Sequence, residues 1–559
     1  MVRTGGQLVV DTLRRHGVDQ VFLVPGESYL PVLDAFYDAP EITVTVCRQE
    51  GGAAMMAEAY GKLTGRPGVC LVTRGPGATN ASAGVHIARQ DSTPLILLIG
   101  QVSTAMQERE AFQEIDYRQM YGPLSKWVAQ IDRPERVTEL LGRAFYTATA
   151  GRPGPVVLAL PEDVLSAETE LQLTRMPVPP VVAHPDPSQI DQIREYLLSA
   201  RQPLVLIGGP GWSEAAVAEL VRFATAWQIP VTAGFRRQDC FPSDHPSYAG
   251  DVGLGINPAL RQRIQNADVL VVIGARLTEI ETGGYTLLTE PTQTLIHVFP
   301  DPEELGRVYP PTLAINAAVA PCVRALAALA PPSQPLWAAH TQTAHAEYLA
   351  WSTPQPLATT LDMGAIITHL RTQLPPDTVI TNGAGNYAIW LHRFYRYRAY
   401  GTQLAPQSGS MGYGLPAAIA AKRVHPQRPV VCLAGDGCFL MTGQELATAV
   451  QYQLAIVIIV VNNSQYGTIR MHQERQFPGR VIGTGLRNPD FTALARAYGA
   501  WAACVTATEA FADALAQALA QDGPALLELK LDPRVLSPNI ILPQDDESLL
   551  APPQQNPVL

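Results

Sequence analysis

The chain has 559 residues, 47% of them apolar, and a formal net charge of −10 at pH 7. This length is enough for about three or four domains. The acidic balance argues against nucleic acid as a main partner. No apolar run reaches the ~18 residues of a transmembrane helix, so we expect neither nucleic acid nor a membrane as a partner.

The chain begins with a segment, 1–20, that is predicted as an amphipathic helix carrying acidic and basic residues rather than as a signal peptide. The seven cysteines are scattered without CxxC spacing. Such a set fits a reducing compartment without structural disulfides or a zinc site. We therefore expect a cytoplasmic protein.

Short apolar runs alternate with helical patterns along the whole chain, which predicts parallel sheets. Proline-rich segments at 176–188 and 330–337 separate three blocks, and we interpret both as extended surface linkers. The predicted domains are 1–175, 189–329 and 340–535, followed by a tail at 536–559. The runs predicted as strands are 69–73, 95–99 and 156–160 in the first block, and 204–209 and 269–274 in the second.

A glycine-rich turn, Gly208-Gly209-Pro210-Gly211, follows the first predicted strand of the second block. It lacks a full GxGxxG pattern and an obvious acidic residue on a following strand, which nucleotide-binding turns carry. A structural turn is the preferred interpretation.

The third block holds the most informative pattern, Gly435-Asp436-Gly437 followed by Asn462-Asn463. Residues 430–434 and 454–461 are predicted as buried strands joined by a helix over 438–453. This unit places Asp436 and Asn463 at the carboxyl ends of two parallel strands, where open α/β sheets bind ligands.

The residue types at that edge favour a magnesium ion with a diphosphate. A carboxylate and an amide oxygen suit Mg²⁺, which takes its other ligands from phosphate and water. The two glycines let the backbone approach a phosphate, and the helix N-terminus beginning at Cys438 adds N–H donors.

The pattern resembles the fingerprint of thiamine diphosphate (ThDP)-dependent enzymes. The resemblance implies that Asp436, Asn463 and the backbone carbonyl of Gln465 bind Mg²⁺. It places Gly435, Gly437 and Cys438 beside the diphosphate.

Within that superfamily, segments of the first block resemble acetolactate synthase. Residues 48–54 (RQEGGAA) are similar to RHEQGAA, which places Glu50 on the glutamate that activates the cofactor's pyrimidine. Residues 71–80 (LVTRGPGATN) are similar to LVTSGPGATN, which places Pro76, Gly77 and Asn80 in the pyrimidine pocket.

The third block supplies a clamp that would hold the cofactor bent. Residues 408–416 (SGSMGYGLP) resemble GGLGTMGFGLP, so the Gly409 carbonyl is expected to accept from the 4′-amino group and Met411 to support the bend. Gly385, Asn386 and Tyr387 fall where the family has GQH around the diphosphate.

Residues 111–116 (AFQEID) indicate which ThDP-dependent reaction to expect. They resemble the acetolactate synthase segment AFQE(V/I)D. Gln113 is expected to hydrogen-bond a substrate or the cofactor, and Phe112 to pack against a methyl group. Lys126 stands where that family has a lysine, either as a substrate contact or as a solvated surface residue. The paired histidines of pyruvate decarboxylases are missing from the sequence, which disfavours simple decarboxylation.

Three departures from acetolactate synthase affect the acceptor side. Ile280 aligns with an arginine that holds the second 2-oxoacid, and an aliphatic residue cannot pair with a carboxylate. His472 replaces a tryptophan of the acceptor pocket, and Arg470 is a candidate to restore the lost charge. The resemblance to ThDP enzymes places Glu27 beside the thiazole, where several decarboxylases have an acidic residue, and we expect it to act either as a catalytic acid or as a cap of the next helix.

The sequence therefore predicts three parallel-sheet α/β domains of the ThDP-dependent decarboxylase and synthase type: pyrimidine-binding, central and diphosphate-binding. The expected function is decarboxylation of a pyruvate-like 2-oxoacid and transfer of the enamine, an acyl anion, to a second carbonyl compound. The alternative is a 2-oxoacid decarboxylase or a C–C lyase, with Glu27 or His472 as the acid. The resemblance implies a homo-oligomer, dimer or tetramer, with active sites at the dimer interface, and we do not expect FAD.

Overall fold

The computed structural model describes residues 2–170, 177–288 and 293–543. The chain divides into two compact units, 1–184 and 185–559, and the second unit contains two of the three large sheets. Each large sheet has six strands, all paired in parallel. These sheets confirm the predicted fold class of three parallel-sheet α/β domains.

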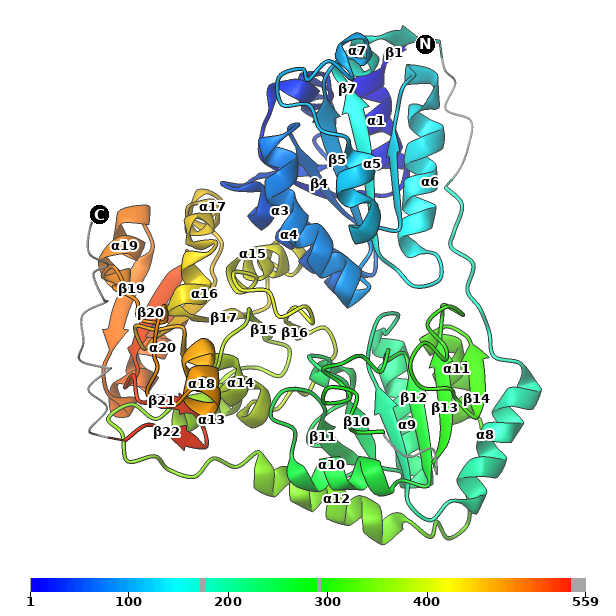
Figure 1. The fold of residues 1–559 in the computed structure, drawn as a ribbon, viewed down its shortest axis with the longest axis vertical. Helices are drawn as coiled ribbons and strands as arrows, with labels where there is room; N and C mark the ends of the chain where they lie inside the picture. Colours follow the sequence, from blue (N-terminus) through cyan, green and yellow to red (C-terminus); the bar gives the residue numbers. More distant parts are fainter. Residues whose placement is uncertain (1, 171–176, 289–292, 544–559) are drawn as a thin grey trace. The chain divides into compact units, whose positions relative to one another are not determined.

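The first unit is built on a sheet of order β3-β2-β4-β5-β7-β6, with helices on both faces (Figure 1). One face packs α1, α2, α6 and α7, and the other packs α3 and α4. The large-sheet strands are β2 (Gln20–Leu23), β3 (Thr43–Val46), β4 (Gly68–Val72), β5 (Leu95–Gln101), β6 (Trp127–Gln130) and β7 (Pro155–Pro161), and β1 (Arg3–Thr4) pairs with β8 (Glu168–Thr169). The helices are α1 (Gly5–Arg15), α2 (Leu30–Tyr37), α3 (Glu50–Thr64), α4 (Pro76–Asp91), α5 (Tyr117–Tyr121), α6 (Val137–Thr149) and α7 (Glu162–Ser166).

Local sequence explains where these helices start. Thr4 and Gln7 form a capping box at the start of α1, the predicted amphipathic helix. Gln49 caps α3 by accepting a hydrogen bond from the Gly52 amide. Pro76 occupies the first turn of α4, where its missing N–H costs nothing.

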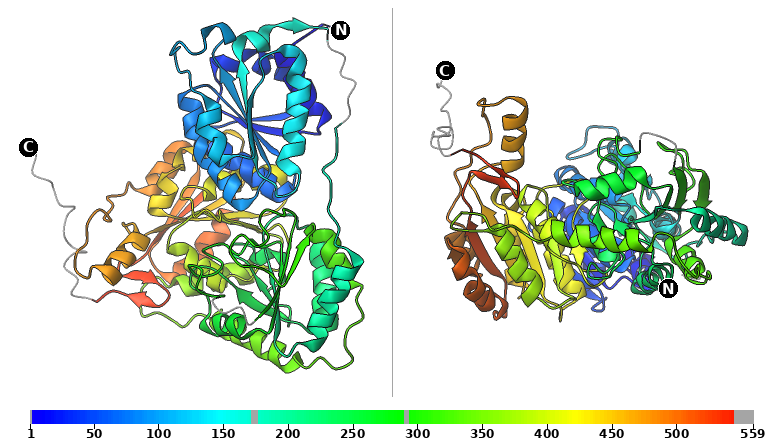
Figure 2. Two further views of the ribbon diagram at one scale, coloured as in Figure 1. Left: turned by 45° about the vertical axis from the view of Figure 1, so that its right-hand side comes forward. Right: turned by 90° about the horizontal axis from the view of Figure 1, so that it is seen from below.

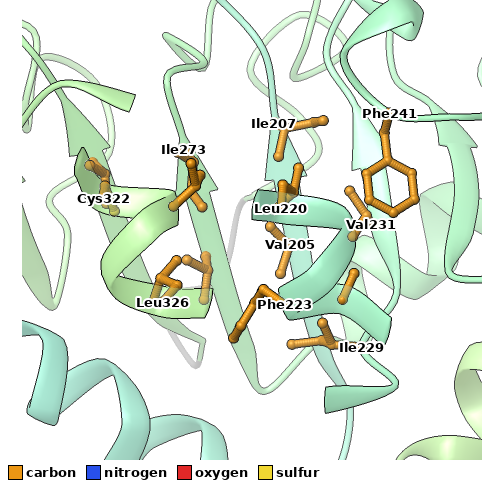
Figure 3. Packing of buried hydrophobic residues seen from close by; sticks show 14 of the residues in the cluster. Val205, Ile207, Leu220, Phe223, Ile229, Val231, Phe241, Ile273, Cys322 and Leu326 are labelled. Atoms are coloured by element: carbon orange, nitrogen blue, oxygen red, sulfur yellow. The ribbon is translucent and has the colours of Figure 1, made fainter. Parts of the chain in front are cut away.

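The central sheet has the order β11-β10-β9-β12-β13-β14, with helices α9 and α11 on one face and α10 and α12 on the other (Figure 2). Figure 3 shows Val205, Ile207 and Ile273 of the strands packed against Leu220 and Phe223 of α9 and Leu326 of α11. The strands are β9 (Pro203–Ile207), β10 (Val231–Ala233), β11 (Tyr248–Asp251), β12 (Val269–Ile273), β13 (Thr294–Phe299) and β14 (Leu313–Asn316). The helices are α8 (Pro187–Ser199), α9 (Glu214–Trp227), α10 (Pro258–Asn266), α11 (Val319–Ala327) and α12 (Ala338–Trp351).

The C-terminal sheet has the order β16-β15-β17-β18-β20-β19. Its strands are β15 (Val379–Asn382), β16 (Gln403–Leu404), β17 (Val430–Gly435), β18 (Val457–Asn462), β19 (Trp501–Val505) and β20 (Ala525–Lys530). A small hairpin, β21 (Val535–Ser537) and β22 (Ile540–Ile541), follows. The helices are α13 (Met363–Gln373), α14 (Tyr387–Phe394), α15 (Gly414–Val424), α16 (Asp436–Leu440), α17 (Leu446–Gln451), α18 (Gly467–Gln476), α19 (Phe491–Tyr498) and α20 (Phe511–Leu519).

The first and third sheets have the same topology. If β2–β7 and β15–β20 are each renumbered one to six, both orders read 2-1-3-4-6-5. The order reverses between β2 and β4 in one sheet and between β15 and β17 in the other, and ligands of open α/β sheets bind at such switch points.

Two sequence predictions for the third block were wrong in detail. The helix predicted over 438–453 is two helices, α16 and α17, because the chain turns at Thr442 and Gly443, and the Thr442 hydroxyl donates to the Gly412 carbonyl at 2.6 Å. The strand predicted over 454–461 begins only at Val457, because the preceding residues form a turn in which the Leu454 amide donates to the Ala449 carbonyl.

The second proline-rich segment is not wholly a surface linker. Trp337 at its end is buried, and its indole N–H donates to the Trp227 carbonyl at 3.0 Å. Helix α12, which follows, packs Ala344 and Tyr348 into the central core. In the first segment, 177–186 has no regular structure, residues 187 and 188 already belong to α8, and residue 176 lies outside the described residues.

The glycine-rich turn after β9, at 208–211, is packed against other protein atoms. A side chain on Gly209 would collide with the Gly274 carbonyl, and the Trp212 indole donates to the Gly208 carbonyl at 2.8 Å. This geometry is that of a structural turn, although the sheet order itself, 3-2-1-4-5-6 when β9–β14 are renumbered, is that of dinucleotide-binding folds.

No helix in the parts of the chain that the structure describes is long and apolar enough to span a membrane.

Candidate active site

A pocket of about 250 Å³ opens at the carboxyl ends of β15, β17 and β18 in the second unit. This is the switch point of the C-terminal sheet. It is lined by every residue that the sequence assigned to the metal, the diphosphate or the clamp: Gly385, Asn386, Tyr387, Gly409, Met411, Gly435, Asp436, Gly437, Cys438, Asn463 and Gln465.

Asp436 is the first residue of α16 and is buried at the end of β17. Its Oδ1 accepts from the Gly437 amide at 2.9 Å, and its Oδ2 accepts from the Asn488 amide group at 2.7 Å. Burial raises the pKa of Asp436, and these hydrogen bonds oppose that effect. A cation at this carboxylate would favour its charged form.

The turn after β18 separates the two asparagines. Asn462 points into the protein, where it donates to Glu528 at 2.6 Å. Asn463 lines the pocket, and its side chain has no hydrogen-bond partner among the described residues. Ser464 has φ 56°, and this left-handed residue turns the chain so that Gln465 returns to the pocket.

The oxygen atoms that face this pocket suit a hard cation as ligands. Asp436 offers a carboxylate and Asn463 an unengaged amide, as Mg²⁺ prefers. The Gln465 carbonyl accepts from the Gly467 amide at 2.9 Å, which uses one of its two lone pairs. Its side-chain Nε2 donates to the Pro533 carbonyl, and the second lone pair of its backbone carbonyl is available to a ligand.

Asn488 is a site residue that sequence reasoning missed. Its Nδ2 donates to Asp436 Oδ2 and also to Asn462 Oδ1, at 2.7 and 2.9 Å. It thereby joins the carboxylate to the buried chain of Asn462 and Glu528. Its position in an irregular loop before α19 gives no sequence signal for this role.

The side chain of Asn386 is hydrogen-bonded to other protein groups. Its amide nitrogen donates to the Leu536 carbonyl at 2.7 Å, and its Oδ1 accepts from Thr468 at 2.9 Å. These bonds connect the start of α14 to α18 and β21. Leu536 of the predicted tail also lines the pocket, while 544–559 lies outside the described residues.

A thiol–phenol contact forms another wall of the pocket. The Tyr387 hydroxyl accepts from the Gly383 amide at 3.0 Å and donates to Cys438 Sγ at 3.3 Å. Burial is the largest cause that raises the pKa of Tyr387 well above its ordinary value, so the phenol keeps its proton. The Gly412 amide also donates to Cys438, at 3.2 Å.

The clamp segment precedes α15. Gly409 has φ 68°, a left-handed conformation that favours glycine, and its amide donates to the Pro406 carbonyl at 3.0 Å. Met411 is half-buried, packs against the core of the C-terminal sheet and lines the pocket.

The first unit has its own group of predicted site residues at the carboxyl edge of its sheet. Glu50 is the first residue of α3, and its Oε2 accepts from Asn80 of α4 at 3.0 Å. Glu50 Oε1 would lie 3.3 Å from a side chain built on Gly77, so that glycine leaves space beside the carboxylate. Pro76, Gly77 and Asn80 all lie on the first turns of α4.

Gln113 and Phe112 lie on the loop between β5 and α5. Gln113 has φ 66°, and its Cβ would be 2.8 Å from a side chain on Gly75. Phe112 is 73% exposed, and its carbonyl accepts from Arg74 Nε at 3.2 Å. Arg74, which follows β4, is a second residue that sequence reasoning did not assign to the site.

Glu27 does not cap a helix. Gly26 is the residue that precedes the 3₁₀ turn, with no side-chain cap, and Tyr29 precedes α2. The Glu27 carboxylate is mostly exposed and lies 3.9 Å from Arg74 Nη2. Of its two predicted roles, that of an acid is the one that stays a prediction.

Other predicted substrate residues are not brought to these edges. Lys126 precedes β6 at the opposite edge of its sheet, where it donates to the Ala150 carbonyl at 2.6 Å. Ile280 is half-buried in the turn after β12. Arg470 of α18 is buried and pairs with Glu474 at 2.9 Å, whereas His472 is exposed on the same helix. Among the described lining residues of the C-terminal pocket, none of Ile280, Arg470 and His472 occurs.

The domains match models of a known enzyme family. Residues 3–120 match the N-terminal TPP binding domain of thiamine pyrophosphate enzymes, 190–326 the central domain, and 383–529 the C-terminal TPP binding domain. These matches show that the chain belongs to the thiamine pyrophosphate (ThDP) enzyme family. It is a ThDP-dependent enzyme whose chemistry is at carbon–carbon bonds.

Within the family, the chain is similar over most of its length to acetolactate synthases. It is 33% identical to acetolactate synthase isozyme 2 large subunit of Escherichia coli, over 94% of this chain and 95% of the relative. It is 32% identical to the probable acetolactate synthase large subunit of Methanocaldococcus jannaschii, over 96% and 93%. It is 30% identical to the mitochondrial acetolactate synthase of Schizosaccharomyces pombe, over 94% and 83%. The predicted resemblance is thereby confirmed.

Proposed function

We propose that this protein is a ThDP- and Mg²⁺-dependent carboligase of the acetolactate synthase type. It decarboxylates a pyruvate-like 2-oxoacid and transfers the remaining acyl unit to a second carbonyl compound. The observation that carries this proposal is the single pocket that collects Asp436, Asn463, the Gln465 backbone and Met411 at one switch point. Similarity to acetolactate synthases supports the ligase reaction.

The chain's own residues would divide the work between binding and proton transfer. Asp436, Asn463 and the Gln465 carbonyl would hold Mg²⁺, and the N-terminus of α16 would face the diphosphate. When bound, ThDP supplies a carbon nucleophile and an electron sink for the bond that releases CO₂. Glu50 would hold a proton at the pyrimidine ring, while Met411 fills space and excludes water.

The acceptor is proposed to lack a carboxylate. Ile280 offers no charge to hold one, and the Arg470 guanidinium is already paired with Glu474. An aldehyde or ketone acceptor needs no such partner. This separates the proposed acceptor from the second 2-oxoacid of acetolactate formation.

A decarboxylase or lyase is the second candidate. The exposure of Glu27 supports it, because a carboxyl group that caps no helix is accessible for proton transfer.

The proposed assembly is a homo-oligomer, in which the first unit of one subunit and the second unit of its partner form each active site. The proposed location is the cytoplasm. All seven cysteines lie in the described ranges and none of them forms a disulfide there, which supports a reducing compartment. FAD is not expected.

Turnover of ¹³C-labelled pyruvate with ThDP and Mg²⁺, followed by NMR with and without added aldehydes, tests the function. A mixed acyloin formed with one CO₂ per product is the expected result. Acetolactate from pyruvate alone would contradict the carboxylate-free acceptor. CO₂ with only free aldehyde would move the enzyme to the decarboxylase class.

A further inference from the structure

Arg74 stands at the switch point of the first sheet, in the loop after β4, the strand that corresponds to β17 of the C-terminal sheet. It follows β4, whereas Glu27 follows the neighbouring strand β2. The related family segment, LVTSGPGATN, has serine at this position. A guanidinium here therefore needs an explanation of its own.

The Arg74 side chain connects the loops of four strands. Nε donates to the Phe112 carbonyl at 3.2 Å, on the loop after β5. Nη1 pairs with Glu162, at the start of α7 after β7, and Nη2 lies 3.9 Å from Glu27 after β2. The side chain is only 11% exposed, which indicates a packed position rather than a solvated one.

The loop that Arg74 contacts contains strained backbone. Glu108, Glu110 and Gln113 all have φ between 54° and 66°, which is unfavourable for residues with side chains. Within the loop, Glu114 accepts from the Glu108 and Ala111 amides. Among the described residues, Arg74 is the only side chain outside 108–114 with a hydrogen bond to that segment that the structure records.

The same contacts place Gln113 on the turn that precedes Gly77. Gly75 has φ 51°, and its amide donates to the Tyr117 hydroxyl at 2.9 Å. A side chain on Gly75 would meet Gln113 at 2.8 Å, so loop and turn are in direct contact. Any movement of the loop would therefore move Gln113 relative to the Glu50 and Gly77 edge.

The charges show that Arg74 is not a receptor for a substrate carboxylate. One guanidinium faces two carboxylates, Glu27 and Glu162, so the cluster has an excess of negative charge. A further anion would be repelled by the two glutamates. Arg74 therefore does not replace the arginine that is missing at position 280.

We propose that Arg74 is a positioning residue that holds the Phe112–Gln113 loop against the Gly75 turn. The expected effect of Arg74 on turnover rests on the proposed function. Its structural consequence can be measured on the enzyme without turnover.

The test compares Arg74→Gln with the wild-type enzyme by hydrogen–deuterium exchange and by steady-state kinetics with pyruvate. Amides in 108–114 should exchange at least ~10-fold faster in the variant. The kcat/KM for the 2-oxoacid should fall about 10- to 100-fold, because small misplacements cost that much. The ThDP concentration for half-saturation should stay within about threefold.

Arg66→Gln is the matched control. Arg66 lies in the same unit at the opposite edge of the sheet, paired with Asp19 at 2.6 Å. It should leave loop exchange and kcat/KM unchanged. Glu162→Gln should reproduce the Arg74→Gln effects, and the double variant should be no worse than either, since the residues act as one unit.

Unchanged exchange in 108–114 would overturn the proposal. So would a raised KM for the 2-oxoacid with normal exchange, which is the pattern of a carboxylate receptor. If the chain does not turn over pyruvate, the exchange result still decides the role of Arg74, so failure of the two proposals can be told apart.

Discussion

Glu50 and Asp436 share one local feature, because each is the first residue of a helix at the carboxyl edge of a parallel sheet. Each is also held by one amide side chain, Asn80 for Glu50 and Asn488 for Asp436. Carboxylates fixed in this way lose little entropy when they meet a ligand, which is how preorganised sites gain efficiency.

Replacement of Glu50 by glutamine should stop catalysis without removing the cofactor. Glutamine keeps the shape and can still accept from Asn80, but it cannot hold the proton, so turnover should fall by ~10²–10⁴-fold. ThDP affinity, measured by fluorescence titration, should change little. Glu139→Gln, an exposed glutamate of the same unit, is the control. Normal turnover in Glu50→Gln would remove Glu50 from the mechanism.

Replacement of Asn488 by alanine should weaken the metal site specifically. Asp436 Oδ2 loses the donor that orients it, and loss of such an outer contact typically costs ~10–100-fold in metal affinity. The Mg²⁺ concentration for half-activation should rise by that factor, with kcat largely restored at saturating Mg²⁺. Asn266→Ala, at the exposed end of α10, should behave as wild type. An unchanged Mg²⁺ requirement would show that Asn488 has no such role.

Residues with a fixed spacing were predictable from sequence, whereas those placed by tertiary contact were not. Asp436 and Asn463 end consecutive apolar strands, so sheet geometry brings them together. Asn488 and Arg74 reach their partners through loops whose course no local pattern encodes.

At the scale of elements, α3 and α4 are joined by a buried ionic triad. Lys62 Nζ lies 2.5 Å from Asp91 and 3.2 Å from Glu58, and all three side chains are nearly inaccessible. Burial lowers the pKa of Lys62, but the carboxylates of Asp91 and Glu58 outweigh it and the pKa is raised. The triad thus fixes the helix pair that presents Glu50 and Gly77.

Lys62→Met should destabilise the protein by about 3–5 kcal/mol, because it removes the ammonium group that contacts both buried carboxylates. Urea unfolding followed by circular dichroism measures this. A raised pKa of a base means that the stabilisation is full at neutral pH and is lost only as pH rises through that pKa, so the difference should be constant from about pH 6 to 9. Lys422→Met, which loses one bond to the Arg428 carbonyl, should cost about 1 kcal/mol. An equal loss of unfolding free energy in the two variants would contradict a stabilising role of the triad.

Buried strands were predicted where they are long and continuously apolar, as in β5 and β7. Strands such as β3, with the sequence TVTV, and β16, with only two residues, have too little apolar length to be recognised. The single helix predicted over 438–453 was wrong because the hydrophobic pattern continues across Thr442, where a tertiary hydrogen bond turns the chain.

In the whole molecule, the two sheets with matching topology, the first and the C-terminal one, carry complementary chemistry. The first supplies Glu50, and the second supplies Asp436 and Asn463. The proposed homo-oligomer combines them from different subunits, as active sites at isologous interfaces do.

Mixing two inactive variants tests this arrangement. If each site takes Glu50 from one subunit and Asp436 from the other, a Glu50→Gln and Asp436→Ala heterodimer contains one intact site. Equal mixing after subunit exchange should then restore about a quarter of wild-type activity. Sites formed within one chain would give no recovery, and mixing either variant with itself is the control.

The most direct test of the central claim is a ThDP titration with Mg²⁺ or with EDTA, read through the fluorescence of Trp390, which lines the pocket. We expect the wild type to bind ThDP only with Mg²⁺, and Asp436→Ala to lose this binding. The exposed substitution Asp513→Ala should bind normally. Normal ThDP affinity in Asp436→Ala would contradict the assignment of the metal site.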